Sequence, residues 1–529
     1  MSPEGGYTKS GVNPWLVAPV VALAAFMEVL DISIANVSLQ HISGDLSAGQ
    51  DESTWVLTSY LVTNAIVLPV SGWLSSVMGR KRFFLACIAG FSVSSLLCGL
   101  APTLALLIVA RAIQGLTGGG LQPSAQAILA DTFPPRQRGM AFALYGMSVV
   151  FAPAIGPTLG GWITDTASWR WVFLLNVPVG VVLSFLVTAM VEDPPHLREA
   201  KAERTSQKLR IDYLGFLLLS MGLGLLQVVL DRGEQEDWYS SPFILWSTII
   251  SATSLVAFVL WELGQDDPIV DLHLLLNRNF ALSNVLMFLL GFVLLGSTVL
   301  LPSLVQRLFG YTATEAGLVI TPGGFSIMLL MPIIGKLVSS MDSRYLIAAG
   351  LAITAGALFH MTGFNLETDY AHFMWARVYQ AMGLSLLFIP INTLAYLGLD
   401  RTKSSSASAL INMSRNLGGS FGIALVVTYL SRQSQIHQST LVGHATPADP
   451  AYRHMIQSLS QSFLTMGDSL QAAHNRALAQ IGQIISGQAQ MMGFIDDFAM
   501  LGWIFLLLIP VVFLMRPAPR HTGPVEGAH

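Results

Sequence analysis

Residues 110–114 read Ala-Arg-Ala-Ile-Gln, and residues 376–380, which lie 266 positions further along the chain, read Ala-Arg-Val-Tyr-Gln. Both stretches lie inside long apolar runs, where a charged residue needs a structural or functional reason. Two more pairs of motifs repeat in the same order and at nearly the same offset. They are Ala143-Leu144-x-x-Met147-Ser148 with Ala409-Leu410-x-x-Met413-Ser414, and Pro69-x-x-Gly72-x-Leu74 with Pro332-x-x-Gly335-x-Leu337. Three ordered matches predict a duplicated chain.

The composition of the chain excludes an ordinary soluble protein. Of its 529 residues, 53% are hydrophobic and 11% are charged, and the mean hydropathy is +0.60. Soluble proteins carry about 25% charged residues, so this chain cannot cover the surfaces of several soluble domains. Membrane lipid is therefore the expected main solvent. The net charge of −4 gives no reason to expect nucleic acid as a partner, and Cys87 and Cys98, both in one apolar run, indicate no disulfide framework.

Fourteen apolar runs are long enough to cross a membrane as helices. About 20 residues are needed, because a helix rises about 1.5 Å per residue through about 30 Å of hydrocarbon. The runs are continuous and do not alternate, which favours helices over barrel strands. Their predicted limits are 15–37, 54–77, 83–101, 104–130, 139–163, 171–191, 211–230, 241–262, 281–305, 317–338, 344–364, 373–397, 406–430 and 494–516.

The basic residues are distributed unevenly over the connecting segments. If the N-terminus lies in the cytoplasm, eighteen of the 27 Lys and Arg residues fall in cytoplasmic segments and six in outside segments, while Arg111, Arg377 and Arg415 lie within spans. Cytoplasmic loops are enriched in Lys and Arg, so this bias predicts that both termini are cytoplasmic. The first run does not fit a cleaved signal peptide, because it is too long and contains Glu28 and Asp31.

The repeated motifs divide the chain into three parts. Residues 1–191 form an N-terminal six-helix half, and residues 281–529 form a C-terminal six-helix half. Residues 192–280 hold a charged cytoplasmic linker and two additional membrane helices. A long excursion on the outer side, 431–493, is expected to be helical over 453–491 and is either a solvated spacer or a docking surface for a periplasmic partner. Internal repeats of this kind are typical of transporters whose halves move about a central site.

Longer motifs add a family resemblance that covers nearly the whole chain. They are Leu30-Asp31-x-x-Ile34-Ala35-Asn36-Val37, Gly72-x-Leu74-x-x-x-x-Gly79-Arg80-Lys81-Arg82, Arg111-x-x-Gln114-Gly115-x-x-Gly118-Gly119, Pro153-x-x-Gly156-Pro157-x-x-Gly160-Gly161 after Gly146, Trp169-Arg170-Trp171-x-Phe173-x-x-Asn176-x-Pro178, and Leu230-Asp231-Arg232-Gly233. With these motifs the chain resembles the major facilitator superfamily, and within it the fourteen-span drug:proton antiporters of the EmrB type. The resemblance implies an all-α integral membrane fold of two six-helix halves plus two additional central helices.

The resemblance also implies proton-coupled multidrug efflux, a function associated with antibiotic resistance. The expected substrates are hydrophobic or amphipathic drug-like molecules exchanged for protons, and no cofactor or metal is expected. The expected location is the inner membrane, where such pumps work with a periplasmic membrane-fusion adaptor of the EmrA type and an outer-membrane channel of the TolC type. The excursion at 431–493 is the candidate adaptor contact. One departure is Ser76, because the family's loop motif usually carries an acid there, so a gating charge pair is absent or rebuilt.

Three ionisable residues within the first and fourth spans are candidates for proton coupling. Asp31 is the preferred proton carrier, because burial and a nearby cation act in opposite directions on a carboxylate; the alternative is a static ion pair with Arg111. Glu28, three residues earlier on the same helical face, is a second titrating group, a polar cavity residue or a structural carboxyl. Arg111 stays charged, and the resemblance implies that it faces the cavity and takes part in coupling.

Polar residues within the spans are candidates for the substrate cavity, namely Asn36, Gln114, Gln380, Asn412 and Arg415. Gln114 offers both donor and acceptor groups, and it either orients the site or bridges helices. Asn412 and Arg415 are three residues apart and are expected to share a helix face. Arg377, nearer the end of its run, is expected to extend to the membrane surface. Because two acids face at least two arginines within the spans, uncharged or weakly anionic amphiphiles are the favoured substrates.

Two motifs are expected to act through shape or as gates. Gly156 and Gly160 allow another helix to approach closely, and Pro153 and Pro157 bend their own helix. Together with Gly146 they form the antiporter motif, which by resemblance seals the pathway when no substrate is bound; the alternative is ordinary small-residue packing. The residues of the cytoplasmic loop motif are Gly72, Gly79, Arg80 and Lys81.

Two other functions are alternatives to efflux. A proton symporter that imports a small nutrient would share the fold, and the antiporter motif argues against it. A membrane enzyme or sensor would need a catalytic constellation. Gly418-x-Ser420-x-Gly422 matches the G-x-S-x-G pattern but lies within an apolar run, and neither H-E-x-x-H nor a P-loop occurs in the sequence. The chain is therefore not expected to be an enzyme.

Overall fold

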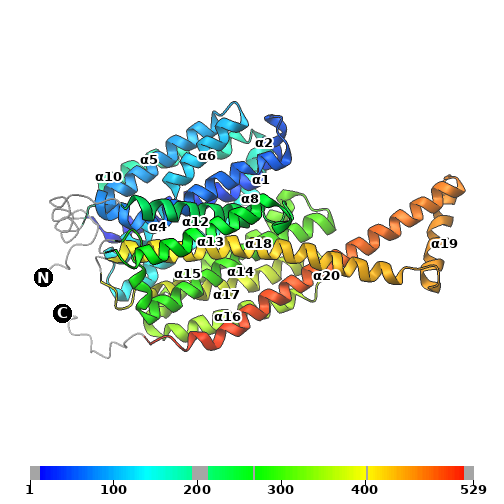
Figure 1. Cartoon of the computed structure of the whole chain (residues 1–529). Helices are drawn as coiled ribbons and strands as arrows, with labels where there is room; N and C mark the ends of the chain where they lie inside the picture. Colours follow the sequence, from blue (N-terminus) through cyan, green and yellow to red (C-terminus); the bar gives the residue numbers. More distant parts are fainter. Residues whose placement is uncertain (1–11, 194–211, 266–267, 401–402, 518–529) are drawn as a thin grey trace.

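A computed structural model of the chain describes residues 12–193, 212–265, 268–400 and 403–517. Within these ranges the protein consists almost entirely of α-helices, most of which run side by side in one bundle (Figure 1). Thirteen of the described helices are long and apolar enough to cross a membrane. The expected all-α membrane fold is thereby confirmed. Most of the predicted charged linker, at 194–211, lies outside the described residues.

The helices follow the predicted spans in order. The first six spans correspond to α1 (Pro14–Val37), α4 (Trp55–Met78), α5 (Arg80–Gly99), α6 (Leu104–Gly118) with α7 (Leu121–Thr132), α8 (Pro135–Thr166), and α9 (Arg170–Leu174) with α10 (Asn176–Met190). The next eight correspond to α12 (Tyr213–Arg232), α13 (Pro242–Glu262), α14 (Arg278–Phe309), α15 (Ala313–Ser340), α16 (Ser343–Met361), α17 (Tyr370–Ala395), α18 (Ser404–His444) and α20 (Leu470–Val512). Connecting segments hold α2 (Leu39–Asp45), α3 (Gln50–Ser53), α19 (Pro450–Thr465), η1 (Trp238–Ser240) and η2 (Leu272–Leu276).

Polar residues placed just before the apolar runs set the starts of several spans. Asn13, Thr103, Asn277 and Asp369 each accept a hydrogen bond from a backbone N–H in the first turn of α1, α6, α14 and α17. These side chains satisfy donors that a helix leaves unpaired at its N-terminus, which typically stabilises a helix by about 1 kcal/mol. The local sequence therefore fixes where these spans begin.

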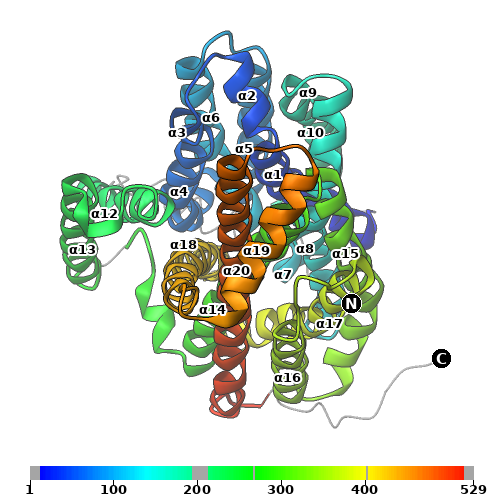
Figure 2. The same ribbon diagram turned by 90° about the vertical axis from the view of Figure 1, so that its right-hand side faces the viewer.

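Corresponding helices pack in the same pairs in the two halves. In the first half α1 packs on α8, α4 on α6, and α5 on both α6 and α10. In the second half α14 packs on α18, α15 on α17, and α16 on both α17 and α20. The halves meet where α8 packs on α15 and α4 on α18, while α12 contacts α4 and α18 and α13 lies outside α12 (Figure 2). This pairing is what a duplicated six-helix unit would give, and the exact domain limits stay a prediction.

The span predicted at 406–430 lies within α18, which is not among the thirteen helices that are apolar enough by composition. Its polar side chains, including Asn412 and Arg415, are buried against other helices rather than exposed to lipid. At Gly418 and Gly422 the helix lies directly against the α14 backbone, where an added Cβ atom would overlap the carbonyl groups of Phe288 and Phe292. The low hydropathy of α18 is therefore explained by its place in the interior of the bundle.

Helices α18 and α20 continue beyond the bundle and are joined by α19, forming a projecting arm over residues 431–493 (Figure 1). The sequence predicted helical structure at 453–491, and the chain there forms α19 and the start of α20, with a turn at 466–469 between them. At the base of the arm, His437 Nε2 lies 2.7 Å from Asp496 Oδ2 and so links α18 to α20. The opposite end of the bundle, where α5, α12 and α18 begin, is called the linker end below.

Candidate transport site

Asp31 and Arg111 form an ion pair that is completely enclosed by the N-terminal half. Asp31 Oδ2 lies 2.5 Å from Arg111 Nη1, and both side chains are inaccessible to solvent. The other carboxylate oxygen, Oδ1, accepts hydrogen bonds from Gln114 Nε2 at 3.0 Å and from Asn176 Nδ2 at 2.7 Å. Gln114 Oε1 in turn accepts from Arg111 Nη1 at 2.8 Å. Side chains of α6 and α10 therefore meet at a carboxylate of α1, and the Ser95 hydroxyl of α5 accepts further hydrogen bonds from Gln114 and Asn176.

The guanidinium of Arg111 is enclosed by neighbouring groups, although its Nη2 is buried without a hydrogen-bond partner. Its Nε donates to the Val56 carbonyl at 3.1 Å, and its carbon lies 4.3 Å from the centre of the Tyr60 ring and 5.5 Å from that of Phe173. Such a contact between a cation and a ring adds about 1–2 kcal/mol where both groups are desolvated. The Arg111 side chain is therefore held beside Asp31 by groups of α4 and α9.

Asn176 is a partner of Asp31 that the sequence analysis did not single out. It belongs to the Trp169–Pro178 motif, which holds the start of α10 in place: Trp169 Nε1 and Arg170 Nη1 both donate to Asp45 Oδ2, at 2.9 and 2.6 Å. These two hydrogen bonds, from Arg170 first and Trp169 second, lower the pKa of Asp45 below its usual value. The motif was the available signal, and its role in positioning Asn176 becomes visible only in three dimensions.

Glu28 lies one turn from Asp31 but has different partners. Its Oε1 accepts from Asn64 Nδ2 at 3.0 Å, whereas its Oε2 is buried without a hydrogen-bond partner. Beside it, Gln122 of α7 accepts a hydrogen bond from Arg415 of α18. The two acids that lie on one helix therefore differ in kind, since Asp31 is fully paired and Glu28 retains an unpaired oxygen.

A second connection between α7 and α18 lies beside the first. Asn412 Nδ2 donates to Gln126 Oε1 at 2.5 Å, and Gln126 Nε2 donates to Asn392 of α17. Tyr145 of α8 donates its hydroxyl to Asn412 Oδ1 at 3.3 Å. The predicted pair Asn412 and Arg415 thus shares a face toward the N-terminal half, and a polar network crosses between the halves.

Two of the predicted cavity residues lie elsewhere. Asn36 is exposed near the arm end of α1, outside both groups of hydrogen bonds. Gln380 is buried within the C-terminal half and accepts from Arg377 Nη1 at 2.6 Å. The expectation that Arg377 reaches the membrane surface is wrong, because its side chain is buried and its other donors bond the hydroxyls of Ser297 and Thr298 at 3.3 and 3.1 Å.

The glycines of the antiporter motif lie at two helix contacts. Cβ atoms added at Gly156 or Gly160 of α8 would overlap or press against Ser33 and Ile34 of α1, so these positions let α1 and α8 touch. Gly146 lies nearer the start of α8 and faces Phe388 of α17 instead, with 2.8 Å between an added Cβ atom and the ring. The motif therefore joins α8 both to α1 and to the opposite half.

Comparisons with known proteins place this arrangement in a family. A family model described as the Major Facilitator Superfamily matches residues 21–423. The chain belongs to this superfamily. Two solved structures share its fold at 13% identity. The major facilitator proton:xylose symporter XylE has a TM-score of 0.59 over 94% of this chain and 95% of that one, and the human organic anion transporter MFSD10 has a TM-score of 0.57 over 93% and 100%.

Curated relatives within the superfamily match nearly the full length. The fatty acid resistance protein FarB of Neisseria gonorrhoeae is 35% identical over 98% of this chain and 99% of its own. The multidrug export protein EmrB of Escherichia coli K12 is 35% identical over 98% of both chains. The colistin resistance protein EmrB of Acinetobacter baumannii is 29% identical over 95% of this chain and 96% of its own.

Arg80 of the cytoplasmic loop motif is paired with Asp131 of α7. Arg80 Nη1 lies 2.5 Å from Asp131 Oδ2, and Ser404 of α18 donates to Asp131 Oδ1 at 2.7 Å. Gly72 lies close to the backbone of residues 405–406, and Gly79 adopts a φ of +87° that favours glycine. Asp131 thus pairs with Arg80 of the loop motif and ties the halves together at the linker end through Ser404.

Lys81 of the same motif is also held in place, since its backbone N–H donates to Asp193 at 2.9 Å and its Nζ to the Thr188 carbonyl at 3.0 Å.

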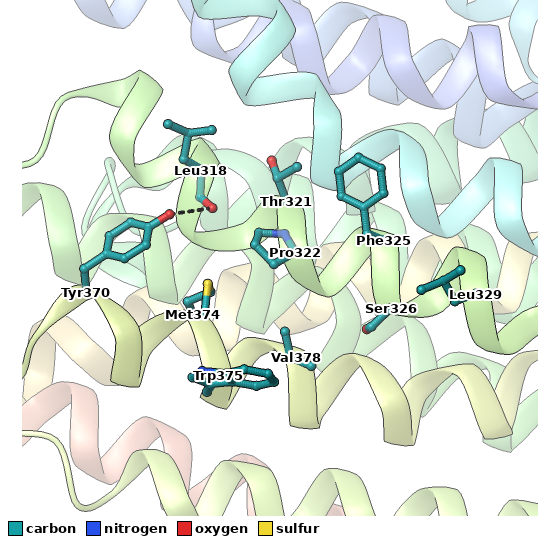
Figure 3. Close-up of a pocket in the computed structure, with 10 residues that line it drawn as sticks. All are labelled: Leu318, Thr321, Pro322, Phe325, Ser326, Leu329, Tyr370, Met374, Trp375 and Val378. Carbon is teal, nitrogen blue, oxygen red and sulfur yellow. Dashed lines mark hydrogen bonds between the residues drawn. The ribbon is translucent and has the colours of Figure 1, made fainter.

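A separate apolar groove of about 440 Å³ lies between α15 and α17, lined by side chains such as Phe325, Tyr370 and Trp375 (Figure 3). None of the predicted site residues lines it. The groove is therefore distinct from the polar network of this major facilitator chain.

Proposed function

We propose that this chain is a proton-coupled exporter of hydrophobic or amphipathic small molecules, with uncharged or weakly anionic compounds favoured. The observation that carries the proposal is that the two acids of α1 have different partners. Asp31 neutralises Arg111 within one half, while Glu28, with an unpaired oxygen, adjoins the network between the halves. Full-length similarity to proteins named for multidrug export supports efflux over the alternative, a symporter that imports a nutrient.

Proton binding to either acid changes which helices are held together. A proton on Asp31 weakens its bond to Arg111 and releases contacts among α1, α6 and α10. A proton on Glu28 removes a negative charge that faces Arg415 across the boundary between the halves. Entry of one proton releases about 2.3 kcal/mol per 100 mV and about 1.4 kcal/mol per pH unit. One proton per uncharged molecule then supports a gradient of several hundred-fold, which is sufficient for export.

Substitution of Glu28 by glutamine is expected to reduce substrate-triggered proton movement at least tenfold. The amide keeps a hydrogen bond to Asn64 but cannot carry a proton through the cycle. The measurement uses protein in liposomes with a pH gradient and a trapped pH dye, to which candidate amphiphiles are added. Glu367→Gln, at an exposed loop position, is the matched control and should behave as the wild type. Wild-type protein that binds a compound yet moves no protons would contradict antiport.

In the orientation that we propose, the linker end lies in the cytoplasm and the arm outside, with both termini cytoplasmic and the protein in the inner membrane. Support comes from Arg80 and Lys81, which lie at the linker end, since basic residues concentrate on the cytoplasmic side. The arm would then reach a periplasmic adaptor of the EmrA type, which in turn joins an outer-membrane channel of the TolC type. Its exposed apolar side chains include Ile436, Val442, Met466 and Leu470.

Deletion of residues 440–485 is expected to abolish co-purification of the adaptor while leaving proton-coupled transport in liposomes intact. The deletion removes α19 with the adjoining ends of α18 and α20 and leaves the bundle helices in place. Its control is the His437→Gln variant, which alters the base of the arm and keeps its tip. Unchanged adaptor capture by the deleted protein would contradict the docking proposal.

A further inference from the structure

The Arg–Gln pair that holds Asp31 in the N-terminal half has a repeat in the C-terminal half. Arg111 Nη1 donates to Gln114 Oε1 at 2.8 Å, and Arg377 Nη1 donates to Gln380 Oε1 at 2.6 Å. Each pair has the same three-residue spacing and lies buried in the corresponding span. In the N-terminal half this arrangement binds a carboxylate, with one oxygen of Asp31 on the arginine and the other on the glutamine.

The carboxylate has no counterpart in the second half. The residue 266 positions after Asp31 is Ser297, and its hydroxyl contacts Arg377 Nη1 at 3.3 Å. Thr298 adds a second hydroxyl, at 3.1 Å from Nη2. Within the described parts of the chain, no carboxylate lies within 4.0 Å of Arg377. Arg377 is therefore a buried positive charge that neutral groups alone surround.

The side-chain amide nitrogen of Gln380, in the second pair, lacks the hydrogen bond that its counterpart makes in the first pair. Gln114 Nε2 donates to Asp31, whereas Gln380 Nε2 is buried and has no partner. The amide of Gln380 cannot be turned over to relieve this, because its oxygen must accept from Arg377. An uncompensated buried charge and an unmade buried hydrogen bond each cost stability. The two orphaned groups belong to one Arg–Gln pair, and one acceptor with a negative charge would satisfy both.

We propose that Arg377 and Gln380 form an anion-binding site, in which a carboxylate or another monovalent anion takes the position that Asp31 occupies in the first half. The stem of Arg377 crosses Gly323 of α15, where an added Cβ atom would lie 3.0 Å from its Cγ, so its path toward α14 is fixed. The anion comes either from the solution, as chloride does, or from the carboxylate head of an amphiphilic substrate. The second source rests on the proposed efflux function, and the first does not.

The test measures the thermal stability of the purified full-length protein in detergent, in N-methylglucamine–HEPES buffer, as sodium chloride, acetate or hexanoate is added. A bound anion is expected to raise the Tm of the wild type by roughly 2–4 °C at saturation. Arg377→Gln should lose this response. Ser297→Asp should also lose it, because the new carboxylate occupies the site from within, and its Tm without added anion should exceed that of the wild type. Ser297→Asn, of the same size and neutral, should keep the response.

The pattern across the anions identifies the source. A response to chloride and to both carboxylates supports a site for small anions in general, and a response that requires hexanoate supports the head of an amphiphile. A wild type that responds to none of the three, or an Arg377→Gln variant that responds equally, overturns the proposal. Binding is measured without a pH gradient, so a failure here is distinct from a failure of proton-coupled export. If Arg377→Gln does not fold, the contrast between Ser297→Asp and Ser297→Asn still decides.

Discussion

Replacing Asp31 with asparagine is expected to abolish substrate-triggered proton movement and to destabilise the N-terminal half. The side chain keeps its size, but Arg111 then lies fully buried without a counter-charge. Removal of one partner from a buried ion pair typically costs about 3–5 kcal/mol, because the remaining charge is left uncompensated. The measurements are the dye signal in liposomes with a pH gradient and the Tm of the protein in detergent.

A double variant separates the effect on stability from the effect on coupling. Asp31→Asn combined with Arg111→Gln removes both charges, so most of the lost stability should return while proton movement stays absent. Proton movement that survives in the single Asp31→Asn variant would contradict the role of Asp31 as carrier and transfer that role to Glu28 or another group.

Replacing Gly418 with alanine is expected to prevent α14 and α18 from packing. The new Cβ atom would overlap the Phe288 backbone, with its carbonyl carbon 2.6 Å away. A backbone group cannot rotate aside as a side chain can, so the helices must separate along a contact that also carries Gly422. Overpacking of this kind typically costs about 1–3 kcal/mol, and a contact with main chain belongs at the upper end. The Tm and the yield of folded protein should both fall.

The same helix offers its own control for this substitution. Gly443 lies in the arm portion of α18, and no atom would lie within 4 Å of an added Cβ there. Alanine at that position should be neutral or should raise the Tm slightly, since alanine favours a helix by about 0.5–1 kcal/mol over glycine. Equal losses in Gly418→Ala and Gly443→Ala would show that helix contact is not the cause.

The sequence alone predicted the membrane helices and, as one of two alternatives for Asp31, its ion pair with Arg111. Asp31 and Arg111 are charged residues within apolar runs, so each needs a partner, and few candidates exist inside the spans. The count of fourteen runs included the polar span at 406–430, because its apolar stretch remains long although its polar face is buried in the bundle. Periodicity and length carry this information, since lipid constrains every span in the same way.

Contacts between distant segments were not predictable in this way. Asp131 pairs with Arg80, but α5 and α6 lie between the two residues in the chain, and no spacing rule connects them. Arg377 lies near the end of an apolar run, which predicted a surface position, yet the packing of α14 and α15 around it buries the side chain. Whether a side chain is buried in the bundle depends on the neighbouring helices, which the sequence of one span does not reveal.

Helix α18 runs without interruption from the centre of the protein into the arm, so a tilt near its centre moves its far end by a larger distance. Arg415 and His444 are separated by 29 residues of one uninterrupted helix, or about 44 Å at a rise of about 1.5 Å per residue. A tilt of the helix by about 10° around Arg415 would displace the tip by about 8 Å. A small rearrangement around Arg415 would thus produce a larger displacement at the tip of the arm, and a restraint on the tip would exert force on the centre in return.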